Sequence, residues 1–61
     1  MAGQLFEATI SRDVAGWTVT VPELDAEVHV ARRVEAESAA RELIAVRTGI
    51  PIGFVAVWVR D

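Results

Sequence analysis

The segment Gly16–Val21 restricts the fold of this chain more than any other part of it. Its apolar side chains alternate strictly with threonines, and this period of two predicts a strand with one face on a core. Pro22 ends the strand, because proline cannot donate to a sheet ladder. Residues 6–12 alternate in the same way, and residues 13–16 supply a short turn that contains a glycine. The two segments predict a β-hairpin.

Two further strands are predicted downstream. Residues 26–31 alternate again, with valines on one face and Glu27 and His29 on the other. Residues 54–59 are apolar on both faces, which is typical of a strand that is covered on both sides or paired in parallel.

Between these strands, residues 35–47 change to the period of a helix. The apolar side of this helix would be formed by Ala36, Ala39, Ala40, Leu43, Ile44 and Val46. Gly49 and Pro51 follow it in the order that helix ends favour. Its start is less well defined, because neither Arg33 nor Val34 is a good N-cap residue.

These elements predict an α+β fold with the order β-β-β-α-β. Three antiparallel strands joined by a right-handed helical crossover to a fourth strand give a mostly antiparallel four-stranded sheet in the order 3-2-1-4, with the helix on one face. The helix-facing residues would be Phe6, Ala8, Ile10, Trp17, Val19, Val21, Val28, Val30, Val55, Val57 and Val59. The opposite face would carry Glu7, Thr9, Thr18, Thr20, His29, Phe54, Ala56 and Trp58.

The length of 61 residues allows one small domain, spanning residues 1–61. Such a short chain buries a small fraction of its surface and is marginally stable alone. It contains no cysteine for a disulfide or a thiolate metal site, while 52% of its residues are hydrophobic. We therefore expect part of the apolar surface to face another chain, as in a homodimer or higher oligomer.

The net charge of −3 argues against a general nucleic-acid binder, because such proteins neutralise phosphates with basic residues. It suits a basic protein partner. The sequence shows neither a charged-then-apolar leader nor an apolar run long enough to span a bilayer. These features predict a cytoplasmic protein that does not bind membranes.

The polar residues do not predict a catalytic or cofactor site. His29 and Glu27 could form half of a metal site, but zinc needs three or four protein ligands. Ser11, Asp13 and His29 contain the residue types of a nucleophilic triad, yet the sequence supplies no cleft or oxyanion hole. The acidic residues Glu23, Asp25 and Glu27 lack the spacing of a calcium loop. We expect a protein that is not an enzyme and that uses no cofactor.

Two other features have competing explanations. Arg32 and Arg33 could contact nucleic acid, or could be a solvated strand end that pairs with nearby glutamates. The phase of Trp58 places it on the face opposite the helix, where a large aromatic side chain is typical of an interface. The predicted interface residues are Phe54, Ala56, Trp58 and His29.

Gly16-Trp17 and Val21-Pro22-Glu23-Leu24, together with the element order, resemble the N-terminal domain of HicB-like antitoxins. The resemblance covers essentially the whole chain. The ribbon-helix-helix or helix-turn-helix domain of that family does not follow Asp61, so DNA binding by this chain is not expected.

This resemblance implies a binding module that neutralises a partner toxin, which in the family is a small basic ribonuclease that cleaves mRNA. The alternative is a homo-oligomeric interaction domain of phage or mobile-element origin without a toxin partner.

Overall fold

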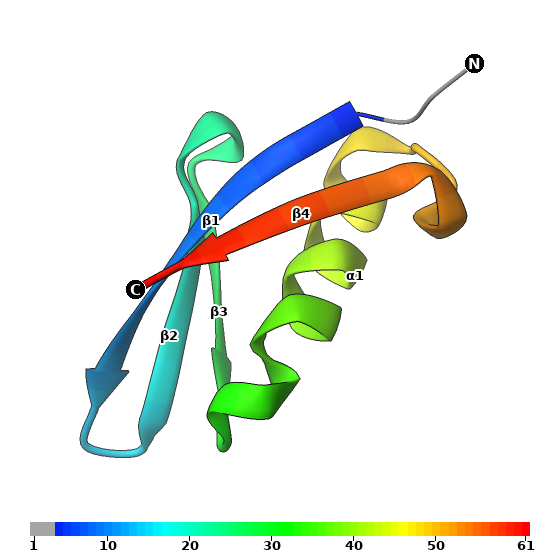
Figure 1. The fold of residues 1–61 in the computed structure, drawn as a ribbon. Coiled ribbons are helices and arrows are strands. Elements are labelled where there is room, and N and C mark those ends of the chain that lie inside the picture. Colours follow the sequence, from blue (N-terminus) through cyan, green and yellow to red (C-terminus); the bar gives the residue numbers. More distant parts are fainter. Residues whose placement is uncertain (1–3) are drawn as a thin grey trace.

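The computed structural model describes residues 4–61; residues 1–3, which the sequence analysis included in the predicted domain, lie outside this range. Four strands and one long helix form the fold (Figure 1). Their bounds are β1 Gln4–Asp13, β2 Gly16–Val21, β3 Ala26–Val30, α1 Ala36–Thr48 and β4 Val55–Arg60. Three short 3-10 turns connect them: η1 Pro22–Leu24, η2 Arg33–Glu35 and η3 Ile52–Phe54.

The sheet has the predicted strand order, β3-β2-β1-β4. β1 pairs antiparallel with β2 and parallel with β4, and β2 pairs antiparallel with β3. The last strand therefore returns through α1 to lie beside the first, as a β-α-β crossover requires. This arrangement confirms the predicted α+β class and leaves β3 and β4 as the edge strands of the described sheet.

The hairpin between β1 and β2 depends on Gly16. Asp13 pairs with Gly16, which leaves Val14 and Ala15 as a two-residue loop. Gly16 has a φ of 145°, and a Cβ at this position would lie 2.4 Å from the carbonyl oxygen of Val30 on β3. Only glycine fits here, because the backbone conformation and the close approach of β3 both exclude a side chain.

The helix begins with a cap that the sequence analysis missed. η2 leads directly into α1, and the Glu35 carboxylate accepts a hydrogen bond from the backbone N–H of Arg32 at 3.0 Å. This bond supplies one half of a capping box. At the other end, Gly49 adopts a left-handed φ of 79° and donates its N–H to the carbonyl of Ala45, as expected for a glycine C-cap.

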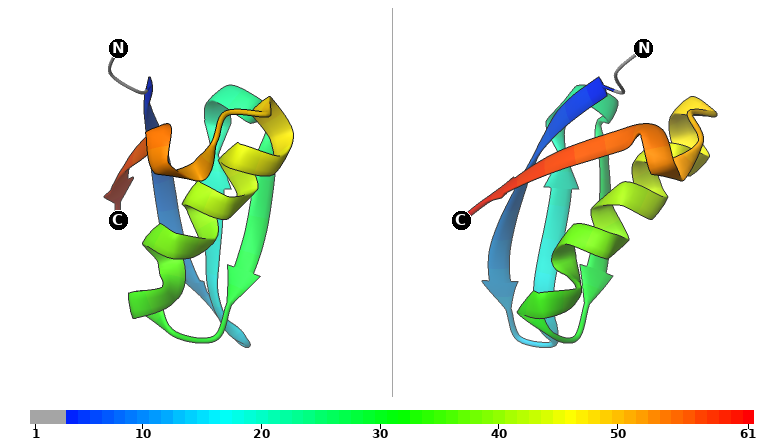
Figure 2. Two further views of the ribbon diagram at one scale, coloured as in Figure 1. Left: turned by 90° about the vertical axis from the view of Figure 1, so that its right-hand side faces the viewer. Right: turned by 45° about the vertical axis from the view of Figure 1, so that its right-hand side comes forward.

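α1 lies on one face of the sheet, and no other described element covers the opposite face (Figure 2). The core between the two layers contains Phe6, Ala8, Ile10, Val19, Val21, Ala36, Ala40, Ile44 and Val55. The remaining helix-facing residues of the prediction, which include Val57 and Val59, are partly buried against this core. The assignment of the two sheet faces is therefore confirmed.

Three details differ from the prediction. Val46 does not join the core side of α1 and is exposed, because its position turns away from the sheet. Phe54 lies in η3 and not in a strand, so strand phase does not place its side chain. Trp17 packs against the core but is only partly buried.

None of the helices within residues 4–61 is both long and apolar enough to cross a membrane.

Candidate functional site

The uncovered sheet face has an apolar end on β1 and β4. Leu5 pairs with Ala56 and Glu7 pairs with Trp58 in the parallel ladder. Leu5 is 67% exposed and Trp58 is 60% exposed. We call Leu5, Ala56 and Trp58 the Trp58 patch. Apolar side chains grouped in this way on a bare sheet face are typical of protein-binding surfaces.

The Trp58 ring is flanked by a charged pair. Arg60 Nη1 donates to Glu7 Oε2 at 2.5 Å, and the Arg60 guanidinium lies 5.8 Å from the centre of the Trp58 ring. The Glu7 carboxylate raises the pKa of Arg60 by hydrogen bonding and by its charge. The Arg60 guanidinium is thereby held beside the exposed Trp58 ring.

The polar end of the same face lies on β2 and β3. Thr18 pairs with His29 across the two strands. The Thr18 hydroxyl donates to Asp13 Oδ2 at 2.6 Å, and His29 Nδ1 lies 3.0 Å from the same hydroxyl and 3.4 Å from Asp13 Oδ2. Asp13 Oδ1 also accepts from the backbone N–H of Ala15. The hydrogen bonds from Thr18 and Ala15 lower the pKa of Asp13.

This cluster has the residue types of a nucleophilic triad. The Thr18 hydroxyl donates its proton to Asp13 Oδ2, so a hydrogen bond between that hydroxyl and His29 Nδ1 requires the tautomer in which Nδ1 carries a proton. Ser11, the serine of the triad that the sequence analysis considered and did not predict, lies opposite Thr18 on β1. The hydroxyl that contacts both His29 and Asp13 is therefore that of Thr18. The contacts tie the hairpin to β3.

The acidic residues near the η1 turn are exposed. Glu23 lies in η1, Asp25 follows it in a left-handed conformation with φ of 50°, and Glu27 lies on β3. Glu27 Oε2 is 3.9 Å from His29 Nε2. Within residues 4–61 no group of three or more histidine, cysteine or acidic side chains could hold a metal ion.

The two adjacent arginines have different surroundings. Arg33 forms an ion pair with Asp61, and its guanidinium also lies 6.0 Å from the centre of the Trp17 ring. Arg12 lies 5.7 Å from the same ring, so two cations flank Trp17 at this end of the sheet. Arg32 is exposed and contributes its backbone N–H to the helix cap. The sequence analysis did not anticipate the contribution of Arg12.

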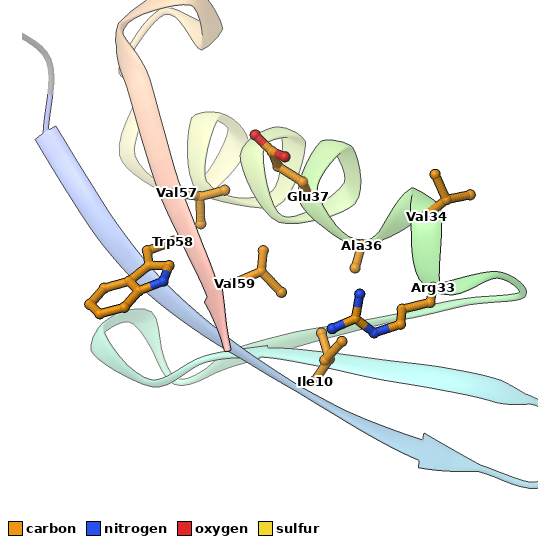
Figure 3. Close-up of a pocket in the computed structure, with 8 residues that line it drawn as sticks. All are labelled: Ile10, Arg33, Val34, Ala36, Glu37, Val57, Trp58 and Val59. Atoms are coloured by element: carbon orange, nitrogen blue, oxygen red, sulfur yellow. The ribbon is translucent and has the colours of Figure 1, made fainter. Parts of the chain in front are cut away.

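A shallow groove of about 380 Å³ runs between the first turn of α1 and β4. Its apolar lining comes from Ile10, Val34, Ala36, Val57 and Val59. Arg33 and Glu37 also line it, with the Arg33 side chain extending between Ile10 and Ala36, and the Trp58 ring points to the opposite side of β4 from Val57 and Val59 (Figure 3).

The predicted interface residues do not form one cluster. Ala56 and Trp58 lie on β4, whereas His29 lies on β3 with β2 and β1 between them. Phe54 is exposed in η3 just before β4. The sequence analysis missed Leu5, although this residue shares the strand phase of Glu7 and Thr9.

No family model matches this chain, and neither the curated proteins nor the solved structures that were compared with it give a significant match.

Proposed function

We propose that this chain is an antitoxin-like protein-binding module that neutralises a small basic ribonuclease by covering it. The observation that supports this proposal is the Trp58 patch on a sheet face that no described element covers. Large aromatic side chains at the centre of an apolar patch contribute most to protein-protein affinity. In this proposal the chain acts in the cytoplasm by occlusion and carries out no catalysis.

The charge distribution supports a basic partner. The chain has a net charge of −3, and Glu23, Asp25 and Glu27 are exposed at the η1 end of the molecule. Arg60 and Arg33, in contrast, are neutralised by Glu7 and Asp61. An acidic surface accelerates association with a basic protein, while apolar contacts hold the complex together.

The test begins with a small basic ribonuclease encoded beside the gene for this chain. Calorimetry should detect binding of the purified pair, and the chain should suppress RNA cleavage by the ribonuclease. Trp58→Ala should weaken binding by about 30-fold, the equivalent of a hot spot of about 2 kcal/mol. Val46→Ala is the matched control, because Val46 is an exposed valine on α1, away from the sheet face. Absence of binding, or equal losses from the two variants, would refute the proposal.

A further inference from the structure

We propose that the outer edge of β4 pairs antiparallel with β4 of a second copy, about a two-fold axis at Val57. The two sheets would then join into one continuous sheet. This pairing is made through the strand edge and takes in only the rim of the Trp58 patch, and it is tested on the chain alone, without the ribonuclease.

The two edge strands of the sheet differ in how they are protected. β3 has five residues and carries Glu27 and His29 on its uncovered face. β4 has six residues, contains no glycine or proline, and carries a single charge, Arg60, at its last position. An edge strand without charges, proline or a bulge presents free backbone groups that pair readily with another strand. The comparison therefore favours β4, and not β3, as the edge that pairs with a second copy.

The groove beside β4 has a mixed lining. Valines of β4 contribute to its apolar part on the helix side of the strand, and Arg33 and Glu37 contribute its polar part (Figure 3). A strand added at this edge would direct every second side chain toward that side. In a second copy these side chains would be Val55, Val57 and Val59, which would extend the apolar part of the lining.

Side-chain size indicates the register. Opposed residues in an antiparallel pair share a face, so a two-fold axis must pass through one residue. With the axis at Val57, Trp58 lies opposite the partner's Ala56, a large side chain opposite a small one. With the axis at Trp58, the two indole rings would lie opposite each other and Arg60 would lie opposite the partner's Ala56. The first register also keeps the two Arg60 side chains apart.

The interface area requires more than a hydrogen-bonded edge. A standard interface takes about 800 Å² from each partner, and the whole chain exposes 4224 Å². The pairing must therefore bury the groove and the rim of the Trp58 patch together with the strand edge. The uncovered faces of the two copies would lie side by side, with their apolar ends at the centre.

The oligomeric state of the chain alone is the first test. Sedimentation at micromolar concentration should give a dimer, and a monomer would overturn the proposal. Because the chain has no cysteine, a single introduced thiol then reports on the register. Val57→Cys places two thiols opposite each other at the proposed axis, and mild oxidation should link the two copies.

Val28→Cys is the matched control, because Val28 is a partly buried, helix-facing valine at the middle of the other edge strand, β3. It should remain unlinked under the same conditions. Circular dichroism establishes that both variants are folded. A dimer in which the Val28→Cys variant crosslinks, or in which the Val57→Cys variant does not, would show that the copies meet elsewhere and would refute pairing through β4.

Discussion

At the scale of single residues, Asp13 has the most specific role in the hairpin. Its carboxylate accepts hydrogen bonds from Thr18 and Ala15 and lies beside His29. These bonds favour the ionised form, and they lower the pKa of Asp13 in the folded protein. The folded state therefore gains stability from Asp13 at pH values above the pKa of the unfolded chain, and loses it as pH falls through the folded value.

We expect Asp13→Asn to lower the melting temperature at pH 7, and we expect this difference to shrink as pH falls through the lowered pKa of Asp13 in the folded protein, where the wild-type carboxyl becomes protonated. Thermal melting followed by circular dichroism across this range measures the difference. Glu23→Gln, which removes an exposed carboxylate from η1, is the control. A deficit of Asp13→Asn that persists unchanged at low pH would show that ionisation of Asp13 does not contribute.

The two tryptophans are expected to differ in their effects on stability. Trp17 packs against the core between Arg12 and Arg33. Trp17→Ala should therefore lower the free energy of unfolding by about 3 kcal/mol. This value is at the low end for core tryptophans, because the ring is partly exposed. Trp58 is 60% exposed, so Trp58→Ala should change the folding of the monomer much less. Urea denaturation of dilute samples measures both costs. The reverse ranking would mean that the ring of Trp58 is the one that supports the core.

At the scale of elements, the β1–β2 hairpin depends on the absence of a side chain at Gly16. A Cβ there would lie 2.4 Å from the carbonyl oxygen of Val30, in a backbone conformation with φ of 145°. We expect Gly16→Ala to destabilise the fold by about 1–3 kcal/mol or more, measured by denaturant unfolding. Gly53→Ala is the control, because no atom lies within 4 Å of the Cβ position at Gly53. Equal losses from the two variants would contradict this account.

At the scale of the whole molecule, acidic residues outnumber basic ones, and two of the six arginines form ion pairs within residues 4–61. Arg33 pairs with Asp61, Arg60 pairs with Glu7, and the net charge is −3. We therefore expect no appreciable DNA or RNA binding by the chain alone at physiological salt. A gel-shift assay with its own promoter tests this. A shift that Arg32→Ala and Arg33→Ala together abolish would instead make these arginines a nucleic-acid contact.

The fold was predictable because its signals are local. Period-two alternation in three segments, a helical period in one and the turn residues between them depend on neighbours along the chain. Together with the right-handed crossover rule, they predicted the strand order 3-2-1-4 and the helix-facing side of the sheet. The exposure of Trp58 follows from the same phase.

The composition of the candidate surface, in contrast, was decided by tertiary structure. Leu5 joins Ala56, and Glu7 reaches Arg60, only because β1 and β4 pair in parallel in one particular register. Thr18 joins Asp13 and His29 because β2 lies between β3 and β1, which ends at Asp13. Residues far apart in sequence meet through strand register, which a one-residue slip would change completely. The sequence alone therefore determined the face of its own strand on which each side chain lies. The pairing of the strands decided which side chains from different strands become neighbours on that face.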